Sequence, residues 1–197
     1  LVWIARKTFR ETFAGQNTAK DMAAYHASAF SPEKLAAVLR CPDSALFLAQ
    51  ELGAPVGYLQ LNRGRAQTEH SPENAAEIQR IYVLSGAKGR GVGSQLMRLA
   101  EKTAREWGCG MLWLGVWEHN LPAQRFYRSH GFERFSQHIF QLGSDAQTDF
   151  LLKKELPSLP ARQEIRIRPA AESDYPAVER IMQQVQALHV SLRPDIY

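Results

Sequence analysis

The sequence predicts an α/β (α+β) protein in which helices alternate with strands, the first two of them in an antiparallel hairpin. Two strand-like runs, residues 45–50 and 56–61, stand on either side of a Gly-Ala-Pro turn and indicate an antiparallel hairpin. A further strand over residues 78–84 leads into a glycine-rich loop, after which a helix begins at Val92. These elements, in a chain of 197 residues, favour one domain with a substantial core and a short appendage.

Three short helices are predicted before the hairpin. Apolar residues within positions 1–13 recur at the spacing of one helical face, so the chain opens inside a helix. Asn17 or Thr18 can cap a second helix that ends near Phe30. A Ser-Pro pair at 31–32 is typical of an N-cap followed by the first turn of a third helix.

After the hairpin, turn residues and apolar periodicity divide the chain into alternating elements. The strand over 78–84 alternates imperfectly, which indicates burial on both faces. The other predicted segments are a polar loop over 62–74, a helix over 92–107, a strand over 111–117, a helix from Asn120 to Gly131, and two closing strands, about 132–140 and 147–154, around a turn at 143–145.

Two prolines, Pro157 and Pro160, mark a change in the character of the chain, because they fit neither a central strand nor a helix interior. Beyond them, residues 164–168 alternate as a strand and residues 174–190 carry an apolar helical face. The predicted organisation is therefore a main domain over 1–156, a Pro-rich linker over 157–163 and a strand–helix tail over 164–197.

Composition argues against several classes of partner. The net charge is +4, but the 24 Lys and Arg residues are scattered, so we expect no nucleic-acid partner. No apolar run approaches the ~20 residues that span a bilayer, so we expect no membrane segment. Cys41 and Cys109 lack metal or disulfide-scaffold spacing, which predicts a cytoplasmic protein with reduced thiols. No metal is expected either, because metal spacing is also lacking among His26, His119, His130 and His138.

The loop Lys88-Gly89-Arg90-Gly91-Val92-Gly93 is suited to phosphate binding. Its glycines let the backbone approach a ligand, and the amides at the start of the following helix carry partial positive charge. The same pattern fits an ordinary glycine-rich turn. A dinucleotide-binding fold is disfavoured, since an antiparallel hairpin comes first and no acidic residue ends a following parallel strand near position 113.

A second block downstream completes a family pattern. It comprises Leu112-Trp113-Leu114-Gly115-Val116-Trp117, Asn120, Ala123-Gln124-Arg125-Phe126-Tyr127 and Gly131-Phe132. With the glycine loop, this block resembles the conserved blocks of the GNAT superfamily of N-acetyltransferases. The resemblance implies the GNAT fold, a mixed, mostly antiparallel twisted sheet that is flanked by helices and splayed at the acetyl-CoA site. It also implies acetyl transfer to a primary amine. Lys88 stands where the family usually has Gln or Arg, which affects a side-chain contact and leaves the backbone amides in place.

A narrower resemblance covers about residues 1–156. Its motifs are Thr8-Phe9-Arg10-Glu11-Thr12-Phe13, Asn17, Tyr25, Phe30, Trp113-Leu114-Gly115-Val116-Trp117-Glu118 and Gln147-Thr148-Asp149. Together they are similar to the PaiA-type polyamine N-acetyltransferases, which implies spermidine or spermine as the acceptor. Two alternatives remain: an amino-acid, peptide or drug amine as acceptor, or a non-catalytic acyl-CoA-binding module.

The GNAT resemblance also implies roles for individual residues. Tyr127 would protonate the leaving CoA thiolate, unless it is only a core aromatic. Glu77 is the candidate base, unless it is a solvated strand-end carboxylate. Asn120 would bond the cofactor, cap a helix, or do both. The other expected contacts to acetyl-CoA come from Ile81, Tyr82, Val83, Lys88, Gly89, Arg90, Gly91, Val92, Gly93 and Ser94. Further groups available for phosphates are Arg125 and Arg128, and for a polycation Glu11, Asp21, Glu73 and Glu118.

The tail raises a question of assembly. GNAT domains normally begin with a strand, whereas this chain begins within what resembles the first helix, so the main domain lacks its usual first strand. Residues 164–174 resemble the opening strand and turn of a second GNAT domain. The tail could be part of a truncated second domain, fill the edge of its own sheet, or be exchanged between the chains of a homodimer. We expect it to pack on a GNAT sheet, with exchange favoured.

Overall fold

The computed structural model describes residues 1–15, 17–68, 74–142, 145–157, 168–169 and 171–192. The chain divides into two compact units, Leu1–Ser158 and Leu159–Tyr197. The tail strand predicted over 164–168 lies outside the described residues except for Arg168, and so do the first two residues of the predicted turn at 143–145.

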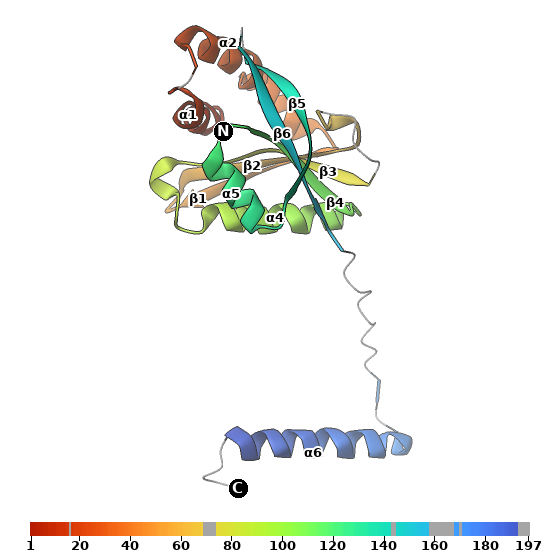
Figure 1. Ribbon diagram of the computed structural model, residues 1–197. Coiled ribbons are helices and arrows are strands. Elements are labelled where there is room, and N and C mark those ends of the chain that lie inside the picture. Colours follow the sequence, from red (N-terminus) through yellow and green to blue (C-terminus); the bar gives the residue numbers. More distant parts are fainter. Residues whose placement is uncertain (16, 69–73, 143–144, 158–167, 170, 193–197) are drawn as a thin grey trace. The chain divides into compact units, whose positions relative to one another are not determined.

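The first unit is built on a mixed sheet (Figure 1). In its described part the strand order is β1-β2-β3-β4-β6-β5, and the neighbours pair antiparallel except for β3 and β4, which are parallel. The mostly antiparallel sheet predicted from the sequence is therefore confirmed. The strands are β1 (Ser44–Glu51), β2 (Ala54–Arg63), β3 (Ala75–Val83), β4 (Met111–Trp117), β5 (Glu133–Leu142) and β6 (Asp145–Glu155).

Helices cover both faces of this sheet. Figure 1 shows α1 and α2 on one side and α4 and α5 on the other. Local capping fixes where several helices begin: Thr18, rather than Asn17, caps α2, Ser31 caps α3, and Asn120 caps α5. The helices are α1 (Val2–Phe13), α2 (Ala19–Ala29), α3 (Pro32–Arg40), α4 (Val92–Glu106) and α5 (Leu121–Ser129), with short 3₁₀ turns η1 (Gly64–Ala66) and η2 (Ser85–Ala87).

The two faces have separate cores. Between the sheet and α4 lies an aliphatic core that includes Leu59, Leu61, Met97, Leu112 and Leu114, each almost fully buried. Between the sheet and α1 and α2 lies an aromatic core, formed by Ile4, Ala5, Phe9, Met22, Phe30 and Tyr58. We call these the α4 face and the α1 face of the sheet.

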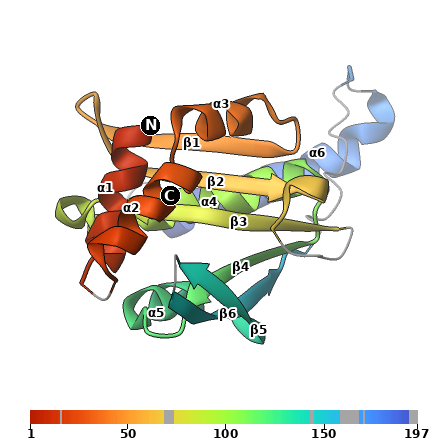
Figure 2. The ribbon, with the colours of Figure 1, turned by 90° about the horizontal axis from the view of Figure 1, so that it is seen from above.

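The parallel strands β3 and β4 separate along their length. They pair only from Ala75–Glu77 on β3 to Met111–Trp113 on β4, and Figure 2 shows them diverging beyond that point. The pairing of β3 with β2 also shifts register at Gln79, which sits opposite no residue of β2. The sheet is therefore opened at its centre, as the predicted splay requires.

The prediction of a polar loop over residues 62–74 is partly wrong. Asn62 and Arg63 belong to β2, η1 follows, and β3 begins at Ala75 rather than at residue 78. The reason is that Asn62 pairs with Glu77 across the two strands, with both side chains buried. Polar side chains that satisfy each other inside a sheet give a sequence pattern typical of loops.

The second unit contains the 3₁₀ turn η3 (Glu172–Asp174) and the helix α6 (Tyr175–Leu192). Asp174 accepts two hydrogen bonds of 2.7 Å from the Arg168 guanidinium and one from the backbone of Ala171, which fixes the start of the helix. The helix predicted over 174–190 is thus present. Its apolar row is exposed and comprises Val178, Ile181, Met182, Val185 and Leu188.

Candidate active site

The glycine loop joins β3 to α4, as predicted, and its glycines differ in what they require. Gly89 and Gly91 have φ of 73° and 82°, left-handed conformations that favour glycine. Gly93 has a different reason, because a Cβ there would lie 3.3 Å from the Phe126 ring of α5. Gly91 is the N-cap of α4 and provides no side-chain cap for the first turn. The loop thus presents backbone amides and a helix N-terminus, which suit a phosphate group.

The side chains expected around this loop are placed as follows. Lys88 ends the turn η2, and Val92 and Ser94 lie in the first turn of α4. Arg90 forms an ion pair with Glu51, the last residue of β1. Arg125 and Arg128 are exposed on α5. The backbone is therefore the part of this loop best arranged to bind phosphate.

The β3 segment Ile81, Tyr82 and Val83 borders the gap between β3 and β4. These residues pair with β2 on one side, and on the other side they lie beyond the last β3–β4 pair. Their side chains divide between the faces: Ile81 and Val83 pack against the α4-face core, and Tyr82 against the α1-face core. The backbone of this segment can accept an extended ligand as an added strand.

Tyr127 lies on α5 and is largely buried. Its ring packs against Phe126 and Phe132, with ring centroids 5.5 and 5.9 Å away. Burial raises the pKa of its phenol well above the ordinary value. The hydroxyl group is therefore protonated at neutral pH and able to donate a proton.

Asn120 stands where β4 gives way to α5. Its Oδ1 accepts a hydrogen bond of 3.2 Å from the backbone N–H of Ala123, so the predicted helix-cap role is confirmed. Gln124 supports the same turn by donating to the carbonyls of Trp117 and Glu118. The cap holds α5, and with it Tyr127, close to the end of β4.

Glu77 is buried on the α1 face, where the last β3–β4 pair forms. Its carboxylate accepts hydrogen bonds from the backbone N–H and the hydroxyl of Thr68, at 2.8 and 2.5 Å, and from Asn62 Nδ2 at 3.5 Å. Burial raises its pKa, and these hydrogen bonds oppose the rise. The alternative of a solvated strand-end carboxylate is therefore wrong.

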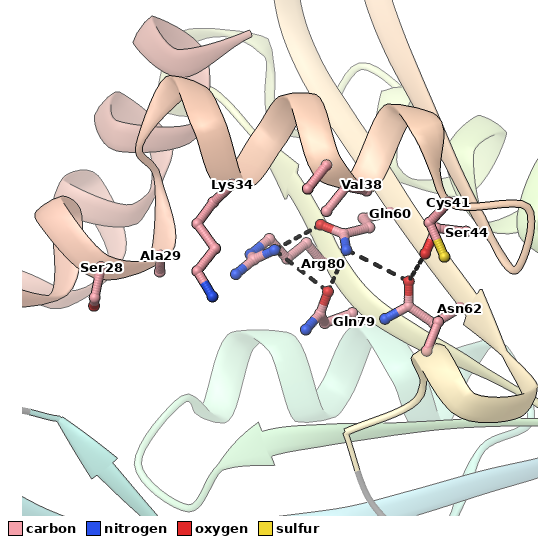
Figure 3. A pocket seen from close by; sticks show the side chains of 12 residues that line it. Ser28, Ala29, Lys34, Val38, Cys41, Ser44, Gln60, Asn62, Gln79 and Arg80 are labelled. Atoms are coloured by element: carbon pink, nitrogen blue, oxygen red, sulfur yellow. Dashed lines mark hydrogen bonds between the residues drawn. The ribbon is translucent and has the colours of Figure 1, made fainter.

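A chain of amide side chains lies beneath α3 and was missed by sequence reasoning. Figure 3 shows Gln60, Asn62 and Gln79 linked by hydrogen bonds, with Ser44 at one end and Arg80 at the other. These hydrogen-bonded side chains line part of a pocket of about 380 Å³. Alternating Gln and Asn within a strand could have signalled a polar face, but their partners come from other strands. The pocket therefore depends on tertiary packing.

Three of the carboxylates considered for binding a polycation lie in the described part of the chain, on different elements. Glu11 accepts hydrogen bonds from the backbone and the hydroxyl of Ser85, Asp21 accepts one from the Thr18 hydroxyl, and Glu73 lies outside the described residues. Glu118 lies close enough to Asp149 to raise the pKa of that residue. Asp149, a motif residue to which the sequence assigned no role, pairs with Trp117 of β4, which puts it on the α1 face.

The histidines are distributed over the unit. His26 packs against the rings of Phe9 and Phe30, and burial lowers its pKa. His130 contacts the Phe126 ring, and His138 lies 3.9 Å from Asp149. Within the described residues, no cluster of His, Cys, Asp and Glu could hold a metal ion. In that same part of the chain, no helix combines the length and apolar character that crossing a membrane requires.

Comparisons with known proteins agree with this arrangement. A model of the acetyltransferase (GNAT) family matches residues 8–132. An uncharacterized N-acetyltransferase from the pepI 3' region of Lactobacillus delbrueckii subsp. lactis is 45% identical over 153 residues, which cover 78% of this chain and 88% of the relative. The streptothricin acetyltransferase of Streptomyces lavendulae is 49% identical over 55 residues, 28% of this chain and 29% of that protein.

Among solved structures, the fold is similar to that of the PaiA N-acetyltransferase of Thermoplasma acidophilum in complex with coenzyme A. The TM-score is 0.64 at 23% sequence identity, and the match covers 78% of this chain and 89% of that one. At this identity the similarity concerns the fold.

Proposed function

The chain belongs to the GNAT family of acetyltransferases and is an acetyl-CoA-dependent N-acetyltransferase, and we propose that its acceptor is the primary amine of a polyamine such as spermidine or spermine. The observation that carries the proposal is the gap between β3 and β4. The glycine loop leads from β3, which borders the gap, into α4. On the α1 face of the sheet lie two carboxylates, the buried Glu77 and the largely buried Asp149. Carboxylates on the face opposite the phosphate-binding helix favour a cationic acceptor.

The chain's own groups fit acetyl-CoA. The left-handed Gly89 and Gly91 and the first turn of α4 would hold the phosphates, and the free edge of Ile81–Val83 would pair with the pantetheine amides. Asn120 would add a hydrogen bond beside its capping role. When bound, acetyl-CoA supplies the acetyl group as an activated thioester.

Tyr127 is proposed as the general acid. The acceptor nitrogen forms a bond to the acetyl carbon while the carbon–sulfur bond breaks, and Tyr127 gives its phenolic proton to the leaving sulfur. The surplus proton of the acylated nitrogen then restores the phenol. Burial raises the pKa of the phenol, which keeps Tyr127 protonated but makes it a weaker acid, so the assignment rests on its position on α5 and on the negative charge that develops on the sulfur.

Substitution of Tyr127 by Phe tests the assignment. We expect kcat to fall roughly 100-fold or more, with the Kd for acetyl-CoA unchanged by isothermal titration calorimetry. Tyr175→Phe, at an exposed position of α6, is the matched control and should behave as the unmodified chain. An equal loss of turnover and of cofactor affinity would remove Tyr127 from the acid role.

A thiol-release assay with acetyl-CoA tests the acceptor. The panel comprises spermidine, spermine, free amino acids, peptide amines and a streptothricin-type antibiotic, the last because one relative is named as a streptothricin acetyltransferase. Fastest release with the polyamines supports the proposal, and fastest release with another amine replaces it. Tight CoA binding without release for any amine would indicate a non-catalytic binding module.

The tail is proposed to pack on the sheet of a second copy, forming a homodimer. Two observations support an exchange: the apolar row of α6 is exposed, and among the described strands β1 is an edge that pairs only with β2. Light scattering should then give the mass of a dimer, and limited proteolysis should leave the tail intact. A monomer with a protease-sensitive tail would contradict the exchange.

A further inference from the structure

Asp149 is a largely buried carboxylate at the edge of the β3–β4 gap. It lies on β6 opposite Trp117 of β4, and its Oδ2 is 3.5 Å from the position that a Cβ on Gly115 would take. Gly115 follows Trp113, the last residue of β4 that pairs with β3. The Asp149 carboxylate therefore borders the gap where the two strands have parted.

The neighbours of Asp149 place it on the acceptor side of the sheet. The ring of Trp117, its cross-strand partner, contacts Phe13 of α1 at 5.9 Å between centroids. Gln147, which shares its strand and face, donates a 2.9 Å hydrogen bond to Asn17 after α1. Both contacts lie on the α1 face, opposite the helix that begins at the glycine loop. An acceptor on this face would approach the gap from the side away from α4.

One oxygen of Asp149 lacks a hydrogen-bond donor among the described residues. Oδ1 is buried and accepts no hydrogen bond from any described residue, while the side chain as a whole is 16% exposed. Oδ2 lies 3.9 Å from His138 Nε2, beyond hydrogen-bonding distance. Glu77, by contrast, receives three hydrogen bonds from Thr68 and Asn62. A buried carboxylate with an unsatisfied oxygen is unfavourable in its charged form, and an ammonium group at Oδ2, beside Gly115, would supply an N–H and balance the charge.

The surroundings of Asp149 favour an organic ammonium over a metal ion. Its cross-strand partner on the same face is Trp117, and the bare backbone of Gly115 leaves room beside Oδ2. Aromatic rings attract organic cations, whereas a divalent metal requires several oxygen or nitrogen ligands. Within the described chain, no such ligand cluster exists.

The charges facing Asp149 suit proton transfer. They are His138 of β5, which lowers its pKa, and Glu118, which follows β4 and raises it. Burial has the largest effect, and together these influences raise the pKa of Asp149 to about 6. The carboxylate is therefore mostly ionised at neutral pH yet basic enough to accept a proton, as a general base must be.

We propose that Asp149 binds the ammonium group of the acceptor amine and takes one of its protons. The proposal rests on the amine acetylation inferred above. One N–H bond of the ammonium breaks, its proton passes to Oδ2, the oxygen beside Gly115, and its electron pair stays on nitrogen as the lone pair that forms the new N–C bond. The carboxylic acid of Asp149 then returns the proton to water.

Asp149→Asn tests this role, because it keeps the shape and removes the charge. Asp43→Asn is the matched control, at a carboxylate whose exposed ion pair with Arg63 lies away from the gap. For Asp149→Asn we expect kcat/KM for the amine to fall roughly 100-fold or more, with loss of the acid limb of its pH profile. Calorimetry with CoA present should show weaker amine binding, with the Kd for CoA unchanged. Asp43→Asn should match the unmodified chain in each measurement.

Gly115→Ala provides a second variant that leaves the charge in place. Its methyl group would sit 3.5 Å from Asp149 Oδ2, an ordinary contact that the fold tolerates, in the space through which an amine would approach. We expect a raised KM for the amine and an unchanged Kd for CoA. An unchanged KM in this variant counts against binding of the amine at Asp149.

Other outcomes overturn the proposal in distinguishable ways. A kcat/KM within about threefold of the unmodified chain and an intact acid limb in Asp149→Asn would exclude the proton-accepting role. Loss of the acid limb in Glu77→Gln alone would assign the base to Glu77. If the unmodified chain acetylates no amine, the proposed function fails by itself. Amine binding measured by calorimetry still decides whether Asp149 holds an ammonium.

Discussion

The two faces of the central sheet are built from the same strands but differ in chemistry. On the α4 face, β2, β3 and β4 contribute aliphatic side chains, namely Leu59, Leu61, Ile78, Leu112 and Leu114. On the α1 face the same strands contribute aromatic and polar ones, namely Tyr58, Gln60, Asn62, Glu77 and Trp113. The strand alternation that sends every second residue to each face makes this division possible.

This difference separates stability from chemistry. Aliphatic burial on the α4 face stabilises the fold without directional demands. Polar groups on the α1 face stabilise the fold only where each finds a partner. Glu77 has such partners, and Asp149 Oδ1 has none within the described residues. The α4 face should therefore tolerate truncation poorly, and the α1 face should contain a group whose removal increases stability.

The largest expected effect is on the α4 face. Leu112→Ala removes a fully buried side chain and should lower the free energy of unfolding by about 2–5 kcal/mol, since a cavity remains. Urea denaturation measures the change. The control is Leu39→Ala on α3, where the side chain is 64% exposed and the change should stay within about 0.5 kcal/mol. Equal losses in both variants would contradict the assignment of stability to this face.

Asp149→Asn should make the protein more stable at neutral pH. The pKa of Asp149 is raised to about 6, so the folded state binds its proton more tightly than the unfolded state does. That contribution favours folding below about pH 4 and is lost as the pH rises through about 6. Relative to the uncharged variant, the unmodified chain should be less stable at pH 7–8 by about 2–3 kcal/mol.

Urea denaturation of both proteins between about pH 4 and pH 8 checks this linkage. The difference in stability should grow with pH between about 4 and 6 and be constant above that range. If the difference in the free energy of unfolding between the two proteins does not change with pH, folding does not raise the pKa of Asp149.

Asn62→Ala tests the satisfied part of the α1 face. It removes the acceptor of the Ser44 hydroxyl and of Gln60 Nε2, and a donor to Glu77, so we expect a loss of about 1–3 kcal/mol. Gln50→Ala is the control, because the amide of Gln50 bonds an exposed carbonyl at the hairpin turn. If both variants unfold at the same urea concentration, the buried amide chain contributes nothing to the fold.

The smallest effect is expected outside both faces. Asp43 and Arg63 form an ion pair of 3.2 Å with side chains 41% and 36% exposed. Asp43→Asn should change the free energy of unfolding by less than about 1 kcal/mol, and added salt should reduce the difference further. A loss as large as that of Asn62→Ala would mean that burial does not distinguish the polar groups of the α1 face from this exposed pair.

Some parts of the site have conformations that are set by residues close together in the sequence. Gly89 and Gly91 were predicted as loop glycines and do adopt left-handed conformations, because a backbone preference is set within a few residues. Gly93 fits the same pattern for a different reason, because a Cβ at this position would lie 3.3 Å from the Phe126 ring. Asn62 was predicted to lie in a loop, since its buried partners on other strands cannot be read from its neighbours in sequence.

The sequence by itself determined the family, the glycine loop, the helix caps and the alternation of helices and strands, because these depend on neighbouring residues. The family resemblance implied an opening in the sheet, and only the tertiary structure decided at which residues β3 and β4 separate and the fate of each carboxylate. In the sequence Glu77 is a strand residue and Asp149 belongs to a family motif. In the described part of the structure, Glu77 is hydrogen-bonded by Thr68, whereas one oxygen of Asp149 has no donor. Burial and hydrogen-bond satisfaction depend on contacts between distant segments, so the chemistry of this face emerges only when those segments pack together.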